Sequence, residues 1–226
     1  MLEREENHVS IGLRQNGWTT LTSSASNSAE RVALSLGRLI PSQRTGLPYV
    51  DLVPHRTEDA AAGTMSSLVG KGAQPLHTDG AHTPAPPHYL IFECLDPGEK
   101  RCPTHIWAMN LRAIIADRDP LLMLPQWVFG DRQRCFYGAI VQKTLSAARV
   151  RFDPLCMAPA SFSSSSIREA QSLLKLYSQE YLIDWEKGSI LIIDNFRCLH
   201  ARGLGSENAP SRRLRRWQVG DTNGMG

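Results

Sequence analysis

Short runs in which apolar and polar residues alternate recur along most of the chain, and this is the pattern of β-strands. From Gln74 onward, several such runs are separated by clusters of turn-forming residues: AQPLHTD, HYLIFECLD, THIWAMN, QWVFG, RCFYGAIVQ and VRFD. A later run, SILIIDN, is almost continuously apolar, which suits a strand buried on both faces. Residues 41–72 are rich in Pro, Gly, Ser and Thr and predict edge strands and long loops. We therefore expect a mainly β fold, a sandwich, barrel or jelly roll.

Two segments have the apolar spacing of helices. Within residues 28–40, apolar side chains recur at intervals close to those of a helix. Asn27 or Ser28 can cap the start of this helix, and Pro41 ends it. The segment LRAIIADRD, which follows Asn110, predicts a second helix.

A third helix is expected after the serine run at 163–166. Ser166 and Glu169 have the spacing of a capping box, and apolar residues form a stripe from Ile167 to Tyr181. We expect this stripe to pack against the core. The tripeptide EKG then predicts a turn that leads into SILIIDN.

Composition and charge restrict the possible partners. The 226 residues are 42% apolar and 21% charged, and neither a repeat nor a linker divides them, so one domain over residues 1–226 is expected. A net charge of +3 indicates neither nucleic acid nor an anionic membrane as partner. The N-terminus lacks the apolar core of a signal peptide, and the five cysteines are spread without a CxxC pair, which favours the reducing cytoplasm. The oligomeric state is not indicated.

The segment QPLHTDGAH contains the first candidate residues for a functional site. His77 and Asp79 are two residues apart in a predicted strand, so both side chains point to the same side and can share one ion. His200, beyond the last strong strand, is a candidate for a third ligand. Two imidazoles and one carboxylate suit Fe(II) and leave positions open for a cosubstrate and oxygen. The same three residue types also suit zinc.

Two stretches of the chain carry a family resemblance: PLHTDGAHTPAPPHYLIFECLDPGEKRCPTHIW and GSILIIDNFRCLHARGLGSENAPSRRLRRWQVGD. They resemble the Fe(II)/2-oxoglutarate-dependent dioxygenases of the taurine dioxygenase and clavaminate synthase group. The resemblance implies a double-stranded β-helix, a jelly roll with flanking helices. It also implies that His77, Asp79 and His200 bind the iron.

In that family a Thr after the HxD strand and an Arg after the distal His hold the remote carboxylate of 2-oxoglutarate. By resemblance, Thr104 in PTHIW and Arg212 in RRLRR take these roles, and Arg216, the last residue of the Arg-x-Leu-x-Arg pattern, lies close by as a further cosubstrate-binding residue. Strand alternation predicts that Arg212, Leu214, Arg216 and Gln218 share one side of their strand. A guanidinium suits this role because it binds a carboxylate bidentately and stays charged when buried.

The implied activity uses Fe(II), 2-oxoglutarate and O2, releases succinate and CO2, and oxidises a C–H bond, usually by hydroxylation. The implied substrate is a small polar metabolite, an amino acid or a natural-product intermediate. Desaturation or cyclisation would need the same residues. Asp79 speaks against halogenation, because related halogenases have a small residue at this position. The alternatives are a zinc hydrolase with the same triad and a catalytically silent jelly-roll binding protein.

Two further arginines are candidates for contact with the substrate. Arg202 follows His200 by two residues and so shares its face, where it can contact cosubstrate or substrate or anchor a loop. Arg151 and Asp153 alternate onto one side and can meet a polar substrate or form a surface ion pair. The histidines not expected to bind the metal are His82, His88 and His105.

Overall fold

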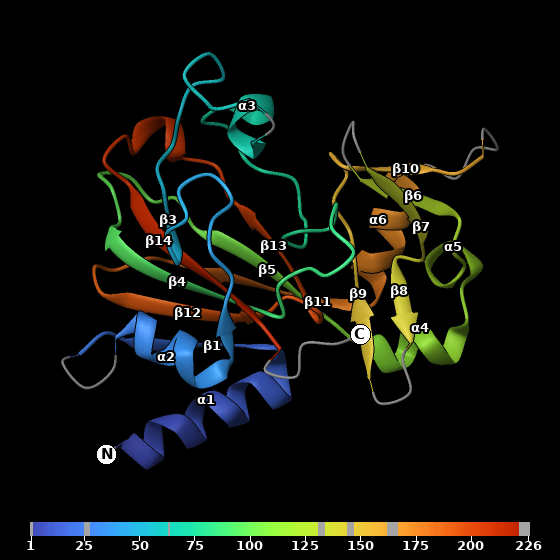
Figure 1. The fold of residues 1–226 in the computed structure, drawn as a ribbon, viewed down its shortest axis with the longest axis horizontal. Helices are drawn as coiled ribbons and strands as arrows, with labels where there is room; N and C mark the ends of the chain where they lie inside the picture. Colours follow the sequence, from blue (N-terminus) through green and yellow to red (C-terminus); the bar gives the residue numbers. More distant parts are fainter. Residues whose placement is uncertain are drawn as a thin grey trace.

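Two antiparallel β-sheets face each other in one part of the molecule (Figure 1). The large sheet has the strand order β1-β12-β4-β14-β2, with β3 also paired to β14, and the small sheet has the order β11-β5-β13. The large sheet is built from β1 (Trp18–Thr22), β12 (Ser189–Asp194), β4 (Tyr89–Asp96), β14 (Arg213–Gly220), β2 (Arg38–Leu39) and β3 (Tyr49–Leu52). The small sheet is built from β11 (Ser178–Ile183), β5 (Thr104–Met109) and β13 (Cys198–Arg202). The expected mainly β architecture is confirmed.

The computed structural model describes residues 2–24, 28–62, 64–130, 134–143, 147–161 and 167–221. Among the residues in these ranges, no helix combines the length and the apolar character needed to cross a membrane.

Strand β12, the SILIIDN run, is buried on both faces as predicted. Ile190 and Ile192 face outward and pack with the helices α1 (Leu2–Asn16) and α2 (Ala29–Leu36), which cover that side of the large sheet (Figure 1). Leu191 and Ile193 face inward and pack against residues of the small sheet. Because successive side chains of a strand point to opposite faces, the residues of this one apolar run are divided between two cores.

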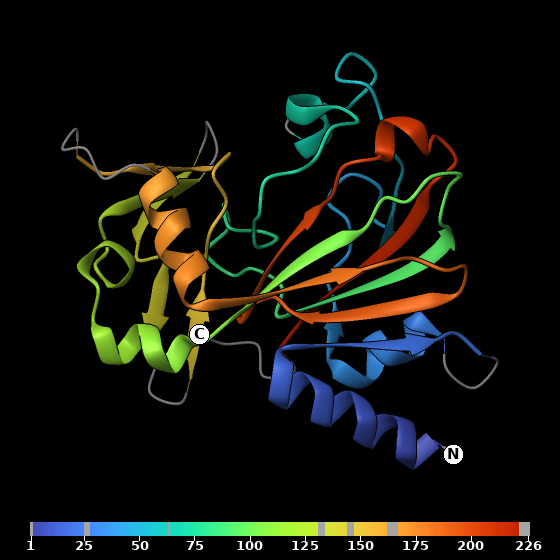
Figure 2. The ribbon, with the colours of Figure 1, turned by 180° about the vertical axis from the view of Figure 1, so that it is seen from behind.

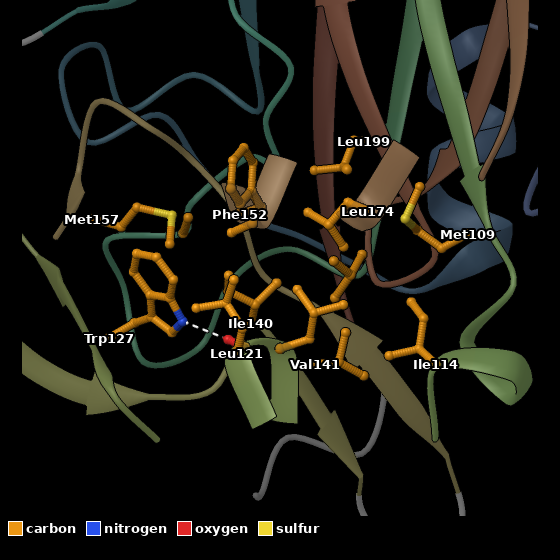
Figure 3. Packing of buried hydrophobic residues seen from close by; sticks show 14 of the residues in the cluster. Met109, Ile114, Leu121, Trp127, Ile140, Val141, Phe152, Met157, Leu174 and Leu199 are labelled. Carbon is orange, nitrogen blue, oxygen red and sulfur yellow. Dashed lines mark hydrogen bonds between the residues drawn. The ribbon is translucent and has the colours of Figure 1, made fainter. Parts of the chain in front are cut away.

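A third group of elements, the side lobe, packs against the outer face of the small sheet (Figure 1). Trp107, Met109 and Leu199 of the small sheet belong to the same buried cluster as the lobe residues. Inside the lobe, the indole of Trp127 donates to the carbonyl of Leu121 at 2.9 Å (Figure 3). The lobe consists of α4 (Leu111–Asp117), α5 (Pro120–Met123), β6 (Trp127–Gly130), β7 (Cys135–Gly138), β8 (Val141–Lys143), β9 (Ala148–Val150), β10 (Met157–Pro159) and α6 (Ile167–Leu176).

Helix α6 joins the lobe to the small sheet, since it leads directly into β11 (Figure 2). Leu174 of α6 is fully buried in the lobe core, whereas Leu176, two residues later, is 78% exposed. We expect Leu174→Ala to lower the free energy of unfolding by about 2–5 kcal/mol, because it removes buried methyl groups and leaves a cavity. Leu176→Ala is the matched control and should change stability by less than about 0.5 kcal/mol. Chemical denaturation of both variants checks this, and equal effects would contradict the packing described.

The first predicted helix is shorter than expected. It spans Ala29–Leu36, with the Ser28 side chain as its N-cap. The chain leaves the helix at Gly37, where a Cβ would collide with the carbonyl oxygen of Gly220. The following residues form β2 and pair with the end of β14. The prediction of a helix to residue 40 was wrong because strand pairing takes over the last residues.

The helix after the serine run is confirmed over Ile167–Leu176. Its predicted stripe extended too far, because Tyr181 lies in β11, where it pairs with Ile106. The helix after Asn110 is α4, and the Asn110 side chain caps it. The predicted caps Asn27 and Ser166 lie outside the described residues.

Other boundaries also differ from the prediction. The run RCFYGAIVQ splits into β7 and β8, and in VRFD only Val150 lies in a strand, β9. The pattern did not reveal α1, β1 or the short helix α3 (Met65–Val69). In the region from 41 to 72, the edge strand β3 was expected and is present.

Candidate metal centre

The segment that carries His77 and Asp79 is not a strand, contrary to the prediction. His77 alone forms a bridge with His200, through backbone N–H···O contacts of 3.0 and 2.9 Å. The pairing cannot continue because the next backbone groups bind elsewhere. The N–H of Thr78 donates to the carbonyl of Phe152 at 2.7 Å, and the N–H of Asp79 donates to the side chain of Asn195 at 2.9 Å.

The bridge nevertheless brings the three predicted ligands together. His200 lies in the middle of β13, and Nε2 of both histidines is 3.5 Å from Oδ1 of Asp79. One ligand atom from each of the three residues lies within 4.8 Å of the others. All three residues are buried, with exposed fractions of 5–7%. Residues separated by more than 120 positions thus converge on one point, as the sequence predicted.

Hydrogen bonding sets the orientation of the His77 ring. Nδ1 of His77 is 2.9 Å from the carbonyl oxygen of Pro75, which can only accept, so Nδ1 carries the proton. In the neutral form of His77 the lone pair is then on Nε2, the nitrogen that lies toward Asp79. Burial opposes a second proton on this ring, but the Asp79 carboxylate raises the pKa of His77 above its usual value. A backbone carbonyl that fixes the tautomer in this way is typical of histidines that bind metals.

His200 has the protonation state of a ligand. Burial lowers the pKa of His200 below its usual value, and the neighbouring His77 lowers it further whenever that ring is protonated. A neutral imidazole is the form that binds a metal. Its Nδ1 is buried and has no hydrogen-bond partner in the described part of the chain.

Asp79 is ionised and oriented by two side chains of β14. Its Oδ2 accepts hydrogen bonds from Nη1 of Arg216 at 2.6 Å and from Nε2 of Gln218 at 3.1 Å. Burial alone would raise the pKa of Asp79, but Arg216 and the two histidines hold it well below the usual value. Oδ1 is left to face the imidazoles. Two neutral nitrogens and one anionic oxygen are a donor set that fits Fe(II).

Strand β14 presents its residues on the sides that alternation predicted. Leu214 packs between the two sheets, whereas Trp217 and Val219 pack on the outer face beneath the helices. Arg216 and Gln218 accordingly reach Asp79 from the inner side.

Arg212, just before β14, is only 4% exposed. Among the described residues it has no ion-pair partner, and its buried Nε has no hydrogen-bond partner. Burial lowers the pKa of its guanidinium, and the nearby groups that act on this pKa are the thiols of Cys94 and Cys102. A buried cation without a counter-charge is costly, so this position favours an anion.

Thr104 begins β5, pairs with Arg202 of β13 and is buried. Its hydroxyl accepts a hydrogen bond from the indole of Trp185 at 3.0 Å. A hydroxyl that accepts in this way still has its own proton to donate. Arg202 lies close enough to Arg212 for the two positive charges to lower the pKa of Arg202, after the larger effect of burial.

The comparisons with known proteins agree on the architecture. No family model matches the chain. Among solved structures, an asparagine oxygenase in complex with Fe(II), 2S,3S-3-hydroxyasparagine and succinate superposes with a TM-score of 0.73 at 15% identity, covering 96% of this chain and 79% of that one. A non-heme iron oxygenase, OrfP, in complex with Fe and alpha-ketoglutaric acid also gives 0.73, at 18% identity and with coverage of 97% and 80%. This chain has the fold of the non-heme iron oxygenases.

A curated sequence relative comes from Fischerella ambigua (strain UTEX 1903). It is the 3-((Z)-2-isocyanoethenyl)-1H-indole synthase, 24% identical over 196 residues, which are 75% of this chain and 69% of that protein. The double-stranded β-helix implied by the resemblance is confirmed by the structural likeness.

Within this oxygenase fold, Arg202 anchors a loop. Its Nε donates to the carbonyl of Gly72 at 3.2 Å, and its Nη2 donates to the carbonyls of Gly70 at 2.5 Å and Gly72 at 2.7 Å. These bonds use Nε and Nη2 of the guanidinium, so of the two roles weighed for Arg202 the geometry favours that of a loop anchor.

Arg151 is held in a similar way. Its guanidinium donates to the carbonyls of Ala81, Thr83 and Pro84 and lies over the rings of Phe129 and Phe136. Burial lowers its pKa to about 10. It therefore ties the loop after Asp79 to the side lobe, and these contacts do not support the prediction that it binds substrate.

The remaining histidines lie apart from the three ligands. His105 pairs with Glu180 at 2.8 Å, and His82 is exposed. His88 stacks between the rings of Tyr89 and Phe196. The described residues contain one cluster with metal-ligand geometry, and none of these three histidines belongs to it.

The sequence reasoning missed the residues that orient Asp79. Gln218 was placed on the correct side of its strand but given no role, and its alternation with Arg216 was the available signal. Asn195 ends the SILIIDN run, and a polar residue directly after a buried strand was the only indication of its importance.

Proposed function

We propose that this protein is an Fe(II)- and 2-oxoglutarate-dependent oxygenase that oxidises a C–H bond of a small molecule, in the first place by hydroxylation. The observation that carries the proposal is the convergence of His77, Asp79 and His200 in a buried cluster within this fold. The buried Arg212, a cation without a counter-charge among the described residues, supports it.

His77, Asp79 and His200 would hold the iron through two Nε2 atoms and Oδ1 of the carboxylate. When bound, Fe(II) supplies the reductive activation of O2, coupled to the decarboxylation of 2-oxoglutarate to succinate and CO2. Arg216 and Gln218 both donate to Oδ2 of Asp79, so only Oδ1 is available as a ligand. Three protein ligands with one atom each leave room for the cosubstrate and oxygen.

Arg212 and Thr104 would bind the remote carboxylate of 2-oxoglutarate. Arg212 offers a planar fork of donors in a buried position, and Thr104 offers its hydroxyl proton. Arg216 would act nearby by fixing Asp79. This assignment accounts for the buried positive charge of Arg212, because the bound carboxylate neutralises it.

The substrate class is a small polar metabolite, an amino acid or a natural-product intermediate. The structurally similar oxygenases were solved in complex with 3-hydroxyasparagine or hydroxyarginine, and the sequence relative is named after an indole product. These names support amino acids and compounds derived from them as the first candidates. We place the activity in one domain over residues 1–226 and in the cytoplasm, where the five free cysteines would stay reduced.

An anaerobic titration tests this function. Fe(II) and 2-oxoglutarate added together should produce a visible metal-to-ligand charge-transfer band. Admission of oxygen with candidate amino acids should then release succinate faster than without substrate. A zinc hydrolase with the same triad, or a silent binding protein, would give neither signal, and that result would refute the proposal.

A further inference from the structure

We propose that Asn195 is a positioning residue that sets the place of the Asp79 carboxylate for the metal. The inference rests on the proposed function, because it concerns the assembly of the Fe(II) site. Asn195 follows β12 directly, 116 residues from Asp79 along the chain.

The side-chain amide of Asn195 forms hydrogen bonds with both backbone groups of Asp79, the N–H and the carbonyl. Its Oδ1 accepts from the Asp79 N–H at 2.9 Å, and its Nδ2 donates to the Asp79 carbonyl at 3.0 Å. The same Nδ2 donates to the carbonyl of Pro87 at 2.8 Å. Asn195 is 1% exposed, so these bonds form away from water.

This contact replaces the strand pairing that the metal-binding segment lacks. Backbone pairing with β13 ends at His77, two residues before Asp79. Beyond that point, the Asn195 amide makes the two bonds to Asp79 that a neighbouring strand would otherwise make. His77 is thus placed by the backbone of His200, and Asp79 is placed by the side chain of the residue that follows β12.

Asn195 is itself held firmly. Its own N–H donates to the carbonyl of His88 at 2.8 Å, and the N–H of the preceding Asp194 donates to the carbonyl of Gly17 at 2.8 Å. The amide therefore projects from a fixed point at the end of a fully buried strand.

The chemistry of the contact calls for an amide. One side chain must accept one hydrogen bond and donate two, and only Asn and Gln combine a carbonyl oxygen with an NH2 group that has two hydrogens to donate. A smaller side chain would leave the buried groups of Asp79 and Pro87 unpaired. The segment could then shift, and displacements of about 1 Å are enough to spoil the geometry of a site.

The test is the metal affinity of Asn195→Ala and Asn195→Ser, measured anaerobically with Fe(II) and with Co(II) as a spectroscopic probe. We expect the Fe(II) dissociation constant to rise about 10- to 100-fold, as for other residues that orient metal ligands. The visible Co(II) spectrum should also change, because it reports the position of the carboxylate ligand. Leu174→Ala is the control, since it loses stability in the side lobe and should keep the wild-type affinity and spectrum.

The outcomes separate this inference from the proposed function. Wild-type protein that binds no Fe(II) would refute the function itself. Wild-type protein that binds Fe(II), with folded Asn195 variants of equal affinity and unchanged Co(II) spectrum, would overturn the role of Asn195 alone. If neither variant folds, amide hydrogen exchange of the metal-free wild type decides. The Asp79 N–H should exchange slowly, and fast exchange would contradict the contact.

Discussion

Replacement of His77 by alanine is expected to abolish Fe(II) binding and turnover. The variant loses one of the two proposed nitrogen ligands, while the backbone bridge to His200 does not depend on the side chain and should persist. A bound metal contributes several kcal/mol to catalysis, so we expect kcat to fall on the order of 10³-fold or more. Equilibrium dialysis with Fe(II) and succinate release measure the two effects.

His105→Ala is the matched control for this variant. His105 lies in the small sheet, like His200, but is paired with Glu180 and stands outside the ligand cluster. It should bind Fe(II) and release succinate as the wild type does. A His77→Ala variant that retained full iron affinity would show that the ligand set has been assigned incorrectly.

Replacement of Arg212 by leucine should weaken 2-oxoglutarate binding about 100-fold while leaving Fe(II) binding intact. The expected size follows because the loss of one partner from a buried charge pair costs roughly 2–5 kcal/mol, and each 1.4 kcal/mol is a factor of ten. The charge-transfer band, titrated with 2-oxoglutarate under anaerobic conditions, gives the dissociation constant.

Stability provides a second measure of the role of Arg212. Without cosubstrate, Arg212→Leu should be at least as stable as the wild type, because it removes a buried charge that lacks a counter-charge among the described residues. With Fe(II) and 2-oxoglutarate, only the wild type should gain substantially in melting temperature.

Arg213→Leu is the control, because Arg213 is the neighbouring exposed residue on the opposite side of the strand. It should keep the wild-type affinity. Equal affinities of wild type and Arg212→Leu would move the carboxylate-binding role to another residue.

The amino-acid sequence alone predicted the buried strand β12, the sides of β14 and the residues that we propose as metal ligands. The near-continuous apolar run of β12 predicted burial on both faces, and alternation in β14 predicted which side Arg216 and Gln218 share. These features are local: side-chain direction in a strand depends only on the spacing of neighbouring residues. The HxD pair and the distal histidine suit zinc as well as iron, and the family resemblance of the surrounding stretches led to the proposed ligand set.

The tertiary structure decided how those residues are held. The segment around Asp79 looked like a strand, but Asn195 and Phe152 replace strand pairing with contacts across 116 and 74 positions. Arg151 was a candidate for substrate contact in the sequence, yet Nη1 and Nη2 donate to backbone carbonyls about 70 residues earlier in the chain. Hydrogen bonds between such distant groups depend on how separate elements pack, and the periodicity of a single segment contains no information about that packing.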